Sequence, residues 1–199
     1  TGWELCYDFT FDDSVDFDDL WTVCDGQYLL YASGVGDPVE DLDSDEDGIR
    51  DNVEANNPNR GDINNDGLAD LLQPNVAGIT NQVTNENVVV EVDEQCGLSD
   101  LSVTPEESNS SLDIGFSYPT GFVNFEADCG EEGFETIVKI YFFNLENAGY
   151  VTRKYNPTTG AYFTVEGAEL TQSPVGDSIA IIATYSVTDG LANDVDGTV

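Results

Sequence analysis

The residues best suited to chemistry in this chain are acidic side chains at regular spacing between Asp43 and Glu54. Oxygen-bearing side chains occupy positions 1, 3, 5, 9 and 12 of this twelve-residue stretch, and Gly48 stands at position 6. A loop that turns alternate residues inward can surround a hard cation with six to eight oxygens, and the glycine permits the sharp turn. The pattern therefore predicts a calcium site. The expected ligands are Asp43, Asp45, Asp47, the backbone carbonyl of Ile49, Asp51 and Glu54.

A second stretch with the same pattern starts 19 residues further along the chain, at Asp62. Position 12 is here Gln73 instead of glutamate, so we expect weaker binding, or completion of the site by a carboxylate from elsewhere. A chain with 40 acidic residues can produce one such match by chance, but two within 31 residues favour a true repeat. The expected ligands are Asp62, Asn64, Asp66, Leu68, Asp70 and Gln73.

Tandem Asp-x-Asp-x-Asp-Gly loops without long flanking helices resemble thrombospondin type 3 repeats, over about residues 41–76. The resemblance implies that the ions are structural, because in that family each ion replaces a missing hydrophobic core and stiffens the segment. Apolar side chains are sparse in residues 37–76, which we call the acidic segment. We expect this segment to be a linker that is either disordered or organised by calcium.

The rest of the chain has the pattern of an all-β protein. Residues 1–36 contain two short strand-like runs, 7–11 and 27–31, which are too few to form a core alone and must pair with other strands. From residue 77 onward, strand-like runs alternate with turns rich in Gly, Pro, Asn and Asp. We expect an antiparallel β-sandwich over 77–199, preceded by the acidic segment. The expected strands are 87–92, 121–127, 134–143, 162–165 and 179–187.

The spaced aromatic residues and turns of this β region suggest a second family. The stretches that carry the likeness are Phe116–Phe125, Lys139–Phe142, Arg153–Phe163 and Asp189-Gly190. They resemble the bacterial choice-of-anchor U domain, over about residues 85–199. The resemblance implies a secreted or surface-displayed bacterial protein without known chemistry.

The four cysteines predict an oxidising compartment. They form no Cys-x-x-Cys pair and the chain has no histidine, which argues against zinc binding. Of the three possible pairings we expect the sequence-local one, with Cys6 bonded to Cys24 and Cys96 bonded to Cys129. Buried free thiols are the alternative.

Net charge and composition exclude several functions. The formal charge of −35 disfavours nucleic acid and anionic membrane surfaces as partners, and no apolar run approaches the roughly 20 residues of a membrane span. The absence of histidine excludes imidazole-based catalysis, and no nucleophile motif appears, so we expect no enzymatic activity.

The first functional expectation is a secreted or cell-surface bacterial structural or adhesion protein with a calcium-rigidified segment. Its partners would be other copies of itself or neighbouring surface-protein domains. An alternative is a subunit of an extracellular filament, in which residues 1–36 complete the sheet of an adjacent copy. Another is a glycan- or peptide-binding module. Its candidate side chains are Tyr118, Tyr141, Tyr155 and Tyr162, although packing within the sheets is the more ordinary role for such residues.

Overall fold

The computed structural model describes residues 42–146, 149–191 and 194. The chain divides into two compact units, Thr1–Asp37 and Pro38–Val199, and the described residues all belong to the second. The acidic segment from residue 42 onward and the strands thus share one unit. The strands and the Cys6–Cys24 bridge expected within residues 1–36 lie outside the described residues.

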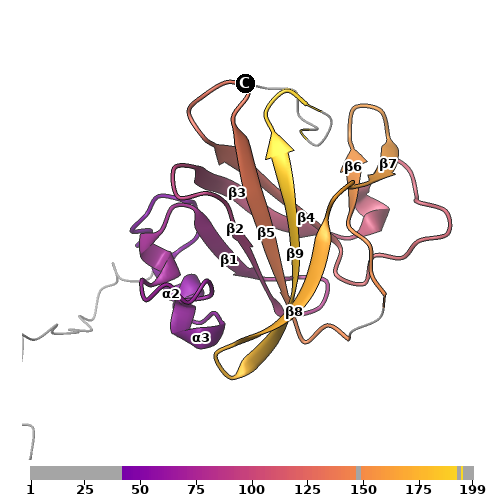
Figure 1. The fold of residues 1–199 in the computed structure, drawn as a ribbon. Coiled ribbons are helices and arrows are strands. Elements are labelled where there is room, and N and C mark those ends of the chain that lie inside the picture. Colours follow the sequence, from indigo (N-terminus) through magenta and orange to yellow (C-terminus); the bar gives the residue numbers. More distant parts are fainter. Residues whose placement is uncertain (1–41, 147–148, 192–193, 195–199) are drawn as a thin grey trace, which may run out of the picture. The chain divides into compact units, whose positions relative to one another are not determined.

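The framework is a five-stranded antiparallel sheet with the strand order β1-β2-β5-β9-β8 (Figure 1). The all-β class and the antiparallel pairing predicted from the sequence are confirmed. Three of its strands match predicted runs closely: β2, β5 and β9. The strand bounds are β1 Val76–Thr80, β2 Asn87–Glu91, β5 Glu135–Phe143, β9 Ser178–Thr188 and β8 Glu169–Val175.

Two smaller antiparallel pairs complete the described strands. β3 (Gly97–Thr104) pairs with β4 (Phe122–Asp128), and β6 (Arg153–Asn156) pairs with β7 (Ala161–Thr164). The helices among the described residues are single turns: α2 (Asp51–Glu54), α3 (Pro58–Gly61) and the 3₁₀ turns η2 (Asp70–Leu72) and η3 (Glu106–Ser108). None of them is long or apolar enough to cross a membrane.

The first face of the sheet packs against the β3–β4 pair. Alternate residues of β2 and β5, such as Val88 and Ile140, join Leu98 and Val103 of β3 in one buried cluster. Burial of each such side chain contributes about 1.5–3 kcal/mol of hydrophobic free energy. The layer on this face, as far as the described residues show it, is the two-stranded β3–β4 pair, so the predicted sandwich is not confirmed.

The second face of the sheet is covered by the acidic segment. Ile63 is fully buried and packs with Val76, Val89, Tyr141 and Phe143, which point to the opposite face from the first cluster. This packing differs from the linker expected from the sequence. Ile63 is therefore one point at which the acidic segment packs on the sheet.

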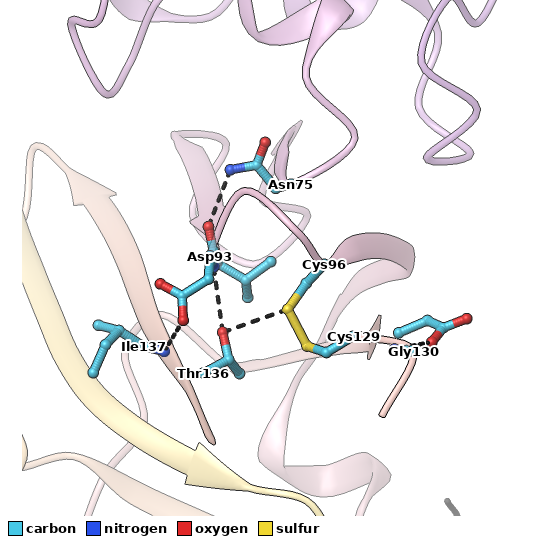
Figure 2. The surroundings of a disulfide bond; sticks show 9 residues. Asn75, Asp93, Cys96, Cys129, Gly130, Thr136 and Ile137 are labelled. Atoms are coloured by element: carbon cyan, nitrogen blue, oxygen red, sulfur yellow. Dashed lines mark hydrogen bonds between the residues drawn. A yellow bond between two sulfur atoms is a disulfide. The ribbon is translucent and has the colours of Figure 1, made fainter. Parts of the chain in front are cut away.

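The predicted bridge between Cys96 and Cys129 is confirmed, and it joins the start of β3 to the end of β4 (Figure 2). The hydroxyl of Thr136 lies 3.7 Å from Sγ of Cys96 and accepts the backbone N–H of Asp93 at 3.2 Å. With a sequence separation of 33 residues, the chain-entropy model gives a stabilisation of about 3–4 kcal/mol. The bridge thus lies beside Thr136, at the start of the central strand β5.

Candidate metal centre

The same pattern of internal hydrogen bonds occurs in both Asp-rich loops. We call residues 43–54 the first loop and residues 62–73 the second loop. At position 1, Asp43 and Asp62 each accept the N–H of the glycine at position 6, at 3.0 and 3.2 Å. At position 5, Asp47 and Asp66 each accept the N–H of the residue at position 7, at 2.7 and 2.8 Å. The sequence repeat is therefore also a structural repeat.

The backbone conformation repeats as well. The residues at position 4, Glu46 and Asn65, have φ values of 65° and 58°, and the glycines at position 6 both have φ of 90°. The second of these values favours glycine, because other residues rarely adopt it. The two glycines are required by the turn that brings the side chains of positions 1, 3 and 5 together.

In the first loop, each of the first three aspartates braces the backbone with one oxygen and leaves the other without a hydrogen-bond partner. Oδ1 of Asp45 accepts the N–H of Asp47 at 3.4 Å, for example, and its Oδ2 has no partner. Ligand atoms of Asp43, Asp45 and Asp47 lie within 4.8 Å of one another. These three side chains can therefore hold a metal ion.

Glu54 is the most deeply buried acidic side chain of the first loop. It is fully buried at the end of α2, and neither of its carboxylate oxygens has a hydrogen-bond partner. Together with the inward oxygens of the three aspartates, it makes five buried oxygens that lack a donor. A buried acceptor without a partner costs about 1–3 kcal/mol, and a charged one costs more.

The electrostatics of the loop agree with this geometry. Burial, followed by the charges of Asp47 and Asp45, raises the pKa of Glu54 from 4.5 to about 9, and the nearby backbone of Gly78 offsets only a small part of this rise. Burial also raises the pKa of Asp47 from 3.8 to about 7, aided by the charges of Asp45 and Asp43. Without a cation, the folded loop can hold these carboxylates only by protonating them or by bearing their repulsion.

Position 9 has a bracing role in both loops. Asp51 accepts the N–H and the hydroxyl of Ser44, both at 2.8 Å, and Asp70 accepts the N–H of Ile63 at 3.1 and 3.2 Å through its two oxygens. Both predicted ligands are thus engaged with the residue at position 2. Sequence reasoning missed Ser44 and Ile63, although their identical offset from the two position-9 aspartates was visible in the repeat.

The centre of the second loop is arranged differently, because Gln73 stands where the first loop has Glu54. Its side-chain amide nitrogen donates to the carbonyl of Leu68 at 3.2 Å and approaches Oδ1 of Asp66 at 3.5 Å. Its amide oxygen accepts from Asn64 at 3.3 Å. Burial, followed by the charges of Asp62 and Asp66, raises the pKa of Asp70 to about 7 despite the N–H of Ile63.

The tyrosines considered as a glycan site are only partly brought together. Tyr118, Tyr155 and Tyr162 cluster with Phe122, with ring centroids 4.3 to 6.3 Å apart, whereas Tyr141 is buried in the second-face cluster. The hydroxyl of Tyr162 donates to the carbonyl of Ser111 at 2.5 Å. The rings therefore fasten the β6–β7 hairpin to the connection between β3 and β4. Glycan binding stays a prediction.

Two of the basic residues form ion pairs within the unit. Nζ of Lys139 lies 2.8 Å from Oε1 of Glu91, and Nε of Arg153 lies 2.6 Å from Oδ2 of Asp113. Such pairs link β2 to β5, and β6 to the connection before β4.

No family model, no curated protein and no solved structure matches this chain. Both family resemblances therefore stay predictions, and the case for function is based on the geometry of the loops.

Proposed function

We propose that the first loop binds a structural calcium ion that holds the acidic segment on the second face of the sheet. The observation that carries this proposal is the set of five buried, unpartnered oxygens from Asp43, Asp45, Asp47 and Glu54. An all-oxygen site with four carboxylates suits Ca²⁺, which accepts six to eight oxygens in flexible geometry. Ile49 would add its backbone carbonyl.

In this proposal the protein has a structural or adhesive role outside the cell and is not an enzyme. The disulfide between Cys96 and Cys129 is compatible with an oxidising compartment. Extracellular calcium is millimolar, which matches the dissociation constants of about 10⁻⁴–10⁻³ M of extracellular calcium modules. The ion would neutralise carboxylates that otherwise repel one another and would stiffen the segment between residues 37 and 76.

Calorimetric titration with calcium chloride tests the proposal. We expect uptake at millimolar calcium or below, and at least a tenfold loss of affinity in Asp47→Asn, which removes an inward-facing carboxylate. Glu46→Gln is the matched control, because Glu46 is the exposed neighbour and belongs to no expected ligand position. Absence of heat in the wild type, or equal losses in the two variants, would contradict the proposal.

Removal of the ion gives a second expected outcome. We predict that a chelator makes the first loop of the acidic segment sensitive to trypsin while the sheet resists, because the fold of this loop depends on the ion. The exposed Arg50 lies inside the first loop and supplies a cleavage site. Mass spectrometry of the fragments measures the result. Identical digestion with and without chelator would contradict a stabilising role of the ion.

A second candidate function, a filament subunit, is favoured by one observation. Among the described strands, β4 pairs only with β3, so its other edge is free for a further strand. Beside it lies a groove of about 1530 Å³ that is lined by apolar residues of β4, β5 and β9, including Phe125, Phe142 and Ile181. A strand of a second copy, which the sequence predicts to come from residues 1–36, could occupy it.

Size-exclusion chromatography and negative-stain images of the native protein test this candidate. We expect concentration-dependent assembly into fibres, and a charged substitution in the groove, Phe125→Glu, should prevent it. A monodisperse monomer at high concentration would count against the filament.

A further inference from the structure

The second loop contains a donor at the place where the first loop leaves acceptors facing one another. The Gln73 side chain is buried, and its nitrogen points at two acceptors, Oδ1 of Asp66 and the carbonyl of Leu68. These are positions 5 and 7 of the pattern, from which a bound cation would be expected to take oxygens. The amide therefore occupies the side of the loop that a cation would use.

The polar atoms of the second loop are also satisfied by one another. Asn64 donates to Oδ2 of Asp66 at 3.0 Å and to Oε1 of Gln73 at 3.3 Å. In the part of the chain that the structure describes, every buried carboxylate oxygen without a partner belongs to the first loop. The second loop thus lacks the feature that marks the first loop as a cation site.

The number of acidic side chains also differs between the two loops. Positions 1, 3, 5 and 12 carry four carboxylates in the first loop but only two in the second, where Asn64 and Gln73 replace two acids. In the second loop, the neutral Gln73 amide lies near the carboxylate at position 5, at 3.5 Å. In the first loop, the ligand atoms of three aspartates lie within 4.8 Å of one another, and the charges of Asp45 and Asp47 also act on the buried Glu54, so this loop has the stronger need for a cation.

We propose that the second loop is closed by the Gln73 carboxamide in place of an ion, so that the chain binds one calcium per molecule, at the first loop. This inference rests on the proposed function and makes the two halves of the acidic segment respond differently. The first loop depends on calcium. The second loop, which presents Ile63 to the sheet, stays folded without it.

The stoichiometry of calcium binding tests the proposal, with Gln73→Glu as the informative variant. We expect one ion per chain in the wild type and two in Gln73→Glu, because the variant restores the acid at position 12. Gln82→Glu is the control: it adds the same charge at an exposed turn and should leave the stoichiometry at one. Asn64→Asp combined with Gln73→Glu should tighten the second site further.

Hydrogen exchange provides a comparison within one molecule, which does not depend on the folding of a variant. The amide protons of Gly48 and Ile49 correspond to those of Gly67 and Leu68, and each donates to the equivalent aspartate. We expect a chelator to speed exchange in residues 43–54 by at least tenfold and to leave 62–73 unchanged.

The outcomes separate this inference from the proposed function. Two ions in the wild type, or equal acceleration of exchange in both loops, would overturn the inference. Either result would mean that the Gln73 amide rotates and offers its oxygen to a bound cation. One ion in both the wild type and the doubly substituted variant would also overturn it. No uptake by the wild type would refute the proposed function itself.

Discussion

At the scale of single residues, the two carboxylate oxygens of each of the first three aspartates in the first loop have different roles. One oxygen of Asp43, Asp45 or Asp47 accepts a backbone N–H within the loop, and the other remains available inside. The backbone bonds orient these side chains, and the remaining oxygens give the loop its negative centre. Glu54 adds two more oxygens from the turn that follows. Preorganisation and repulsion thus come from the same side chains.

We expect the stability of the chelated protein to fall as pH rises from about 4.5 to 9. The pKa of Glu54 is raised to about 9 and that of Asp47 to about 7, so the folded state holds protons that the unfolded state has already lost. Such groups leave stability intact below the unfolded pKa and remove it as pH rises, by at most about 1.4 kcal/mol per pH unit for each group.

Urea denaturation between pH 5 and 8.5 measures this dependence. Saturating calcium should reduce this dependence, because the ion binds the ionised carboxylates of the first loop, whereas Asp70 in the second loop keeps its raised pKa. Glu54→Gln should reduce the slope in chelator. A stability that is constant or rises with pH in chelator would contradict the assignment of these pKa shifts.

At the scale of elements, the acidic segment approaches the sheet at a glycine. A Cβ added to Gly78 in β1 would lie 2.1 Å from the side-chain nitrogen of Asn57 and 2.9 Å from Val89. Asn57 also accepts a hydrogen bond from Asn87 of β2 at 2.8 Å. The absence of a side chain on β1 therefore lets the turn after α2 lie directly on the strands.

Gly78→Ala is expected to lower the free energy of unfolding by about 1–3 kcal/mol, the usual cost of overpacking. Gly97→Ala is the matched control, since Gly97 also lies in a strand but a Cβ there meets nothing within 4 Å. Equal effects of the two substitutions on the urea midpoint would show that Gly78 is not a point of close approach.

Ile63→Ala tests the anchoring of the segment on the sheet. Ile63 is 2% exposed in the second-face cluster, so we expect a loss of about 2–5 kcal/mol from the lost contacts and the cavity left behind. Ile114→Ala, at an 89% exposed position, should change stability by less than about 0.5 kcal/mol. Urea unfolding compares the two variants, and similar values would argue that Ile63 does not anchor the segment.

At the scale of the whole molecule, the charge of −35 opposes compaction. Part of this cost is long-range repulsion, which monovalent salt screens, and part is the local repulsion in the first loop. A cation seated among four carboxylates relieves the second part far better than a diffuse ion atmosphere does. The protein should therefore respond to calcium more strongly than to ionic strength.

We predict that sodium chloride raises the melting temperature of the chelated protein modestly. Millimolar calcium should raise it several degrees further than sodium chloride at the same ionic strength. Differential scanning calorimetry makes the comparison. Equal shifts at matched ionic strength would mean that calcium acts only by screening.

The sequence by itself determined the features that depend on local order. The two loops follow from residue types at fixed offsets, strands such as β5 follow from their alternation, and the local Cys96–Cys129 pairing was predictable from spacing. Other strands were missed for local reasons: β3 is interrupted by an irregularity in register between Ser99 and Ser102, and β8 is an exposed edge strand. Their apolar pattern is correspondingly weak.

Only the tertiary structure decided how the acidic segment is used. Ile63 looked like an isolated apolar residue, and its burial depends on Val89 and Tyr141, which are far away in sequence. The contacts at position 12 likewise became visible only in the structure: Glu54 is buried without a hydrogen-bond partner, whereas Gln73 bonds with Asn64 and Leu68. Periodicity and spacing report what a segment can form, whereas the partner that covers it is set by contacts between distant parts of the chain.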